Sequence, residues 1–69
     1  MKLYFENSRD ERRLIAEPNT ELDAWNEIHK FCDERDFKIY YVRTWRNGEG
    51  LMKYDVGSHT EFFYLDDKE

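Results

Sequence analysis

The sequence has little of what a disulfide-bonded, membrane-spanning or loop-rich protein needs. Its 69 residues include one cysteine, one proline and three glycines. The single cysteine, Cys32, cannot form an intramolecular disulfide, so we expect a reducing compartment, the cytoplasm. Charged residues interrupt every apolar run, including the first six residues, so we expect neither a signal peptide nor a transmembrane helix. The length also excludes a solenoid, a doubly wound nucleotide-binding sheet and a barrel enzyme.

Aromatic and charged residues make up much of what is present. Twelve Phe, Tyr and Trp residues (17 %) supply apolar surface for a folded core in a chain that is 39 % charged. A domain of this size seldom gains more than about 3–5 kcal/mol from its core, so we expect a further support from idealised packing, a metal or oligomerisation.

The net charge of −5 is unevenly distributed along the chain. Residues 37–54 carry a net charge of +3, whereas residues 1–36 and 55–69 carry −4 each. Because an acidic chain repels nucleic-acid phosphates at long range, binding to nucleic acid is disfavoured. Arg43 in the basic segment is a candidate contact for an anion.

Residues 21–35 have the pattern of an amphipathic helix, without an intervening glycine or proline. Thr20 is a suitable N-cap, and Asp23 takes the fourth position of a capping box. The apolar stripe expected to face the sheet consists of Leu22, Trp25, Ile28 and Cys32, with Ala24 and Phe31 at its margin.

The remaining segments predict strands. These are residues 2–6, 12–17, 37–46, 51–56 and 61–65, although residues 11–17 would also fit one or two helical turns. The expected fold is α+β, a single antiparallel sheet in the order β-β-α-β-β-β with one helix packed on one face. We expect one domain over residues 1–65 and a disordered acidic tail over residues 66–69.

Asn47-Gly48 predicts a tight turn between the third and fourth strands. A two-residue turn and a four-residue loop differ by two residues in register, so both turn the same side chains toward the helix. Arg43 would be the one charged residue on the covered face, where it would pair with Glu17 or a helix acid, or bind an anion. The apolar residues expected on that face are Ile39, Tyr41, Trp45, Tyr54, Val56 and Phe63.

One helix covers one face of a sheet, so the opposite face remains open. Its predicted partner-binding residues are Tyr40, Val42, Leu51, Phe62 and Tyr64. An exposed aromatic patch is typical of contact with a second copy or another protein. The alternative is that cross-strand aromatic pairs only stabilise a solvated sheet.

A few residues could support metal or nucleophilic chemistry. His29 and Cys32 are three residues apart on the expected helix, and His59 could add a third ligand, but no CxxC or HExxH spacing is present. A core cysteine beside a histidine at the helix edge explains the pair more simply. The adjacent Ser58 and His59 cannot readily face each other from a tight loop, as a hydrolase would need. We therefore predict no enzymatic activity, no metal and no cofactor.

Four short motifs resemble a known group of proteins. They are Leu3-Tyr4-Phe5-Glu6-Asn7, the helix from Trp25 to Phe31, Tyr40-Tyr41 followed by Trp45, and Asp55-Val56-Gly57-Ser58 followed by Phe62-Phe63. Together they resemble small uncharacterised proteins that phages and prophages of Gram-positive bacteria encode. The resemblance implies an accessory role in the bacterial cytoplasm and implies no catalytic residues.

These observations favour a small acidic interaction module that acts through its exposed aromatic sheet face, as a homodimer or as a binder of a host protein. One alternative is an acidic inhibitor that imitates nucleic acid and blocks a DNA-binding protein. Another is a small metal- or ligand-binding protein that uses His29, Cys32 and His59.

Overall fold

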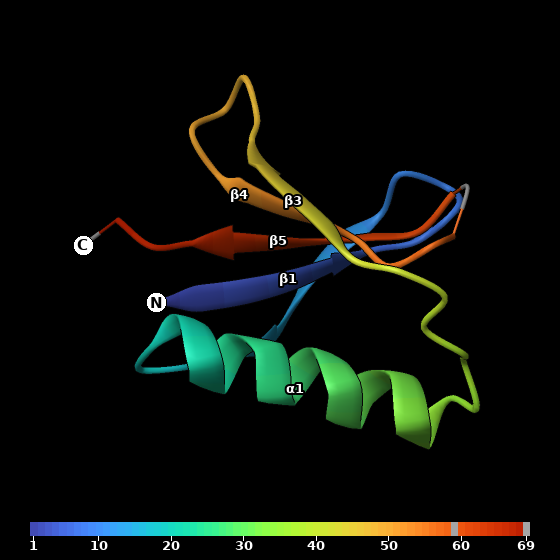
Figure 1. Ribbon diagram of the computed structural model, residues 1–69. Coiled ribbons are helices and arrows are strands. Elements are labelled where there is room, and N and C mark those ends of the chain that lie inside the picture. Colours follow the sequence, from blue (N-terminus) through green and yellow to red (C-terminus); the bar gives the residue numbers. More distant parts are fainter. Residues whose placement is uncertain (59, 69) are drawn as a thin grey trace.

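A computed structural model describes residues 1–58 and 60–68. Over these residues the chain forms β1 (Lys2–Glu6), β2 (Arg12–Ala16), α1 (Glu21–Glu34), β3 (Arg43–Arg46), β4 (Met52–Asp55) and β5 (Phe62–Asp66). The strands form one antiparallel sheet in the order β2-β1-β5-β4-β3. Figure 1 shows α1 beneath β1 on one side of the sheet, with the β3–β4 hairpin projecting away from the helix. The predicted α+β class and element order are confirmed.

The expected cap begins α1, but its buried stripe lies to one side of the predicted one. The Thr20 hydroxyl accepts a hydrogen bond from Asp23 N–H (3.0 Å), which satisfies a backbone donor that the first turn leaves unpaired. Leu22 is 67 % exposed, so its predicted place against the sheet is wrong. The helix instead buries residues four apart, which lie on one face of an α-helix: Ala24, Ile28 and Cys32.

A hydrogen-bonded turn ends α1 and directs the chain back toward the sheet. Asp36 has a left-handed backbone conformation (φ 58°). Its N–H bonds the Asp33 carbonyl (3.1 Å), and Phe37 N–H bonds the Cys32 carbonyl (2.8 Å). This pair of bonds is a Schellman motif, which usually has glycine at the left-handed position.

The hydrophobic core lies between α1 and the sheet. The sheet residues predicted there at Tyr54, Val56 and Phe63 are confirmed as buried. Trp25, Phe31 and Ile39 pack against this core and are partly buried. The buried cluster consists of Leu3, Phe5, Ala24, Ile28, Cys32, Tyr54, Val56, Phe63 and Leu65.

The third strand is shorter than predicted. Residues 37–42 were expected to begin it, but the strand covers only Arg43–Arg46. The β3–β4 register would place Val42 opposite Val56, yet the Val56 carbonyl accepts its hydrogen bond from Tyr40 N–H (3.2 Å). This offset of two residues interrupts the ladder, because antiparallel strands need a constant register to pair.

The β3–β4 connection has an odd number of residues, which reverses the predicted orientation of β3. Arg46 pairs with Met52 and Trp45 with Lys53, so residues 47–51 form a five-residue connection. Gly50 N–H bonds the Asn47 carbonyl (3.1 Å), and Gly50 has a φ of 80°. A change of one residue in register moves every side chain of a strand to the other face. Trp45 is therefore 41 % exposed on the open face, where the sequence predicted burial, and Tyr41 beyond the end of β3 is 47 % exposed.

The C-terminal segment is ordered further than predicted. Asp66 is the last residue of β5 and pairs with Lys2, and the Asp67 carboxylate accepts two bonds from Arg46 (2.7 and 3.0 Å). The expected disordered tail over residues 66–69 is thus wrong for these two residues, and Glu69 lies outside the described chain. Within residues 1–58 and 60–68, no helix is long and apolar enough to cross a membrane.

Candidate functional site

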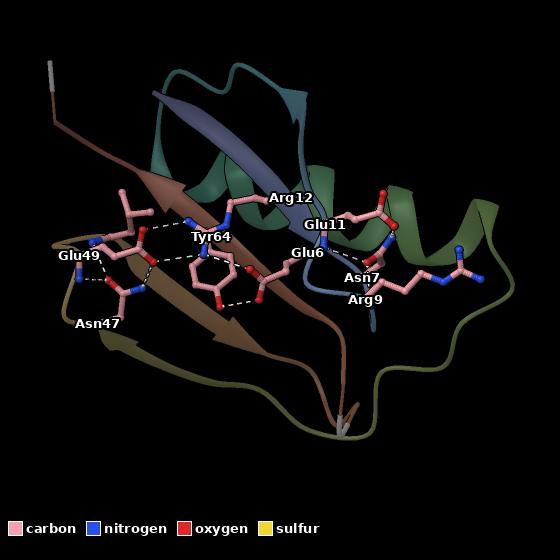
Figure 2. A network of polar contacts seen from close by, with 9 residues as sticks. Glu6, Asn7, Arg9, Glu11, Arg12, Asn47, Glu49 and Tyr64 are labelled. Carbon is pink, nitrogen blue, oxygen red and sulfur yellow. Dashed lines mark hydrogen bonds and ion pairs between the residues drawn. The ribbon is translucent and has the colours of Figure 1, made fainter.

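The open face of the sheet carries a network of polar contacts over Tyr64 (Figure 2). The Arg12 guanidinium lies 3.9 Å from the centre of the Tyr64 ring and bonds the Glu6 carboxylate (3.1 Å). It also bonds both oxygens of Glu49, in the β3–β4 loop (3.1 and 3.2 Å). The Tyr64 hydroxyl donates to Glu6 (3.0 Å), and Tyr64 is only 4 % exposed. The predicted exposure of Tyr64 is therefore wrong, because the chain covers this ring with its own arginine.

Lys53 covers a second part of the same face. Its ammonium nitrogen lies 4.0 Å from the centre of the Phe62 ring and 5.7 Å from that of Trp45. A cation over an aromatic face is attracted by the ring's quadrupole, so Lys53 shields Phe62 from solvent. Phe62 is half-buried, and so is Leu51, which lies before the start of β4 toward the other end of β5. On the open face, the charged groups of Arg12 and Lys53 thus cover the aromatic rings of Tyr64 and Phe62.

Exposed apolar side chains collect at the third strand instead. Of the predicted contact residues, Tyr40 is 70 % exposed and Val42 is 41 % exposed. Tyr41 and Trp45, which the sequence placed in the core, are exposed beside them. We call the following the β3 surface: strand β3 together with Tyr40, Tyr41 and Val42. Of the six large hydrophobic residues exposed in the described part of the chain, four lie on this surface.

The backbone of β3 is available along its outer side. β3 is the last strand of the sheet, and no strand in the described residues pairs with its outer edge. Asn47 N–H bonds the Leu51 carbonyl (2.8 Å). Because inward and outward residues alternate in an antiparallel ladder, the backbone groups of Trp45 also face β4, and those of Thr44 and Arg46 face outward.

Arg43 lies on the exposed side of β3, so the prediction that it sits on the covered face is wrong. Its Nη2 bonds the Asp55 carboxylate (2.8 Å), and its side chain is 66 % exposed. Neither Glu17 nor a helix acid is its partner. The Gly57 N–H, which bonds Asp55 at 3.0 Å, and then Arg43 hold the pKa of the Asp55 carboxyl below its usual value. Arg43 therefore joins β3 to the last residue of β4.

His29 and Cys32, which were considered for metal or thiol chemistry, differ in their surroundings: one is exposed and the other is buried. Cys32 is 2 % exposed within the core, and burial raises the pKa of its thiol, which disfavours the reactive thiolate. His29 is exposed and packs edge-on against Trp25, with ring centres 4.4 Å apart. His59 lies outside the described residues. In the part of the chain that the structure describes, no group of three His, Cys, Asp or Glu residues could hold a metal ion.

Ser58 has a structural role in the β4–β5 loop. Its hydroxyl accepts hydrogen bonds from the N–H groups of Thr60 (3.3 Å) and Glu61 (3.1 Å). These bonds satisfy loop backbone groups, as serine commonly does in turns.

Sequence reasoning missed Tyr41 and Trp45 as surface residues. The available signal was the second glycine in Asn47-Gly48-Glu49-Gly50. A glycine at that position suits a loop that ends in a left-handed residue and a bulge, which changes the register by an odd number.

Comparison with known proteins assigns no relative to the chain. No protein-family model matches it, and neither a curated protein nor a solved structure matches it. The geometry of the β3 surface is therefore the main basis for a functional proposal.

Proposed function

We propose that this protein is a small non-enzymatic interaction module that binds an extended acidic segment of another protein along the outer edge of β3. The observation that carries the proposal is the combination of an unpaired edge strand with exposed Tyr40, Tyr41, Val42 and Trp45. In strand addition, main-chain hydrogen bonds supply affinity and the flanking side chains supply specificity. The outward backbone groups of Thr44 and Arg46 would form those bonds.

The charge of this segment favours an acidic partner over a second copy. Residues 37–46 contain three cations, Lys38, Arg43 and Arg46, and no acid. Two copies joined at β3 would bring four arginines, Arg43 and Arg46 of each copy, onto adjacent strands, and residues 37–46 of the second copy would offer their remaining N–H donors no carboxylate. Arg43 bonds Asp55 through Nη2 alone, which leaves further N–H donors for a partner carboxylate. Edge charges of this kind also limit self-association.

The biological setting is proposed from the sequence. The resemblance to phage and prophage proteins and the single cysteine support an accessory role in bacterial cytoplasm, with a host or phage protein as the partner.

Imitation of nucleic acid is less well supported by the charges. A mimic needs unpaired carboxylates spaced like phosphates, but several acids are neutralised within the chain. These are Glu6 and Glu49 at Arg12, Asp55 at Arg43, and Asp67 at Arg46.

A proline substitution tests strand addition directly. Thr44→Pro removes an outward N–H while leaving the ladder to β4 intact, since proline is tolerated at solvent-facing edge positions. The wild type and Thr44→Ala should retain the same protein from a lysate of the bacterial host, and the purified partner should then bind Thr44→Pro at least tenfold more weakly. Trp45→Ser should also weaken binding, through loss of a side-chain contact.

The control measurements separate folding from binding. Far-ultraviolet circular dichroism should show that Thr44→Pro keeps the wild-type fold. Equal affinity of the folded Thr44→Pro variant and the wild type would contradict strand addition. Loss of binding on substitution of Phe62, with Thr44→Pro still binding, would move the contact to the open face.

A further inference from the structure

Figure 1 shows the chain turning back toward the sheet after the C-terminal end of α1. Residues of this turn line a small pocket. It has a volume of about 130 Å³ and shares no lining residue with the β3 surface. Its apolar walls are Phe5, Phe31, Cys32, Phe37, Val56 and Phe63. Three charged residues, Arg35, Asp36 and Glu61, also line it.

The aromatic walls support one another. The ring centres of Phe5 and Phe31 are 4.7 Å apart, those of Phe5 and Phe63 are 5.3 Å apart, and those of Phe31 and Phe63 are 5.6 Å apart. Each distance is within the range of favourable ring packing. Phe63 is 2 % exposed, which leaves its ring little freedom to move into the pocket. The packed rings therefore hold the pocket open.

The electrostatics of the pocket favour a positive charge. The Arg35 guanidinium lies 5.0 Å from the centre of the Phe5 ring and 5.2 Å from that of Phe31, so these ring faces already attract a cation. Asp36 and Glu61 are two acidic residues of the lining, against one basic residue, Arg35. Arg35 is itself exposed, so its side chain can turn toward solvent when another cation takes its place.

We propose that this pocket binds a small organic ammonium ion of the methylated type. A cavity of about 150 Å³ accommodates one six-membered ring, so the pocket suits a group of the size of tetramethylammonium. Aromatic side chains arranged around a quaternary ammonium recognise it through their ring faces, and nearby carboxylates add an attraction that a neutral molecule lacks. Exchange of the Arg35 guanidinium for the ligand keeps a cation beside the rings.

Three probes of similar size and different charge test this proposal on the full chain. Tetramethylammonium, tert-butanol and pivalate are titrated while the ring protons of Phe5, Phe31 and Phe63 are followed by NMR, with sodium chloride keeping the ionic strength constant. We expect saturable shifts with tetramethylammonium only. Glu61→Gln should weaken its binding about fivefold, as loss of a partly solvated charge pair does.

A matched variant and the competing outcomes complete the test. Glu34→Gln removes an acid of the last turn of α1 that does not line the pocket, and it should leave the affinity unchanged. Phe37→Leu should weaken binding by removing one ring. Equal shifts with tert-butanol would show a merely apolar cavity and overturn the proposal. A preference for pivalate, or no saturation by tetramethylammonium up to about 50 mM, would also overturn it.

Discussion

Asp36 occupies a position that glycine would fill with less strain. Its φ of 58° lies in the left-handed region, which costs a residue with a Cβ atom about 1–2 kcal/mol. Its negative charge also lies beside the C-terminus of α1, where the helix dipole disfavours an anion. We predict that Asp36→Gly raises the free energy of unfolding by about 1 kcal/mol, measured by urea denaturation at neutral pH.

The control for this prediction is Asp36→Ala. Alanine removes the charge but keeps the Cβ atom, so it should recover only the electrostatic part of the gain and stabilise the protein less than glycine does. Equal gains in Asp36→Gly and Asp36→Ala would show that charge, and not backbone conformation, determines the effect.

Asp55 should make the folded state sensitive to acid. The Gly57 N–H and Arg43 lower the pKa of Asp55 in the folded protein, so the unfolded chain binds its proton more tightly. The stabilisation is complete above the unfolded pKa, about 3.9, and is lost as the pH falls through the lower folded value. We predict a smaller loss of stability between about pH 5 and pH 2 in Asp55→Asn than in the wild type. Urea denaturation across this pH range measures the difference, and parallel curves would contradict it.

At the scale of elements, two glycines hold the connections on either side of β4. Gly50 has a φ of 80°, and a Cβ atom there would meet the flexible end of Lys68. Gly57 has a φ of 99°, and a Cβ atom there would lie 2.9 Å from the Cβ of Tyr40. The clash at Gly57 is the more costly one, because the Cβ of Tyr40 is fixed to the Tyr40 backbone and cannot move away as the end of Lys68 can.

These contacts predict an order of stabilities for alanine variants. Gly50→Ala should cost about 1–2 kcal/mol from backbone strain alone, and Gly57→Ala should cost more, about 2–3 kcal/mol, because it also displaces Tyr40. Gly48→Ala is the matched control, since no atom lies within 4 Å of its added Cβ. It should change stability by less than about 0.5 kcal/mol. Thermal denaturation ranks the three variants, and equal losses at Gly48 and Gly57 would contradict the assignment.

The same hairpin shows how far the sequence predicts the fold. Periodicity and capping predicted α1 and the alternation of β4 and β5, since each is decided by residues within one turn or one strand. The face of β3 depended on one additional loop residue, and periodicity within β3 carries no information on it. Exposed positions such as Tyr41 therefore could not be separated from buried ones by composition.

The candidate site was predicted in part for a related reason. Tyr40 and Val42 are exposed as predicted, but Tyr64 is buried beneath a side chain 52 residues earlier in the chain. Contacts of this kind join segments that are distant in sequence. A sequence pattern identifies an apolar residue on a face without showing which charged side chain covers it.

For the whole molecule, Arg12 links the two edges of the sheet across its open face. It lies on β2 at one edge, contacts Tyr64 of β5, and reaches Glu49 in the loop that joins β3 and β4 (Figure 2). The hydrogen bond with Arg12 lowers the pKa of Glu49, which agrees with an ionised pair. The β3–β4 hairpin is thus held over the open face by a contact to the far edge of the sheet.

Arg12→Gln should release this hairpin without unfolding the core. We predict a loss of about 1–2 kcal/mol, because Tyr64 loses its covering cation and Glu6 loses its ion pair while keeping the hydrogen bond from the Tyr64 hydroxyl. Amide hydrogen exchange should accelerate at residues 48–51 more than at Leu3 or Ile28, which lie in the core. Glu49→Gln should give the same local acceleration with a smaller loss of stability, since Tyr64 remains covered. Arg13→Gln is the matched control, because Arg13 lies on the other face near Phe31. If Arg12→Gln and Arg13→Gln accelerated exchange in the hairpin equally, a general loss of positive charge would explain the result, and the link across the sheet would be rejected.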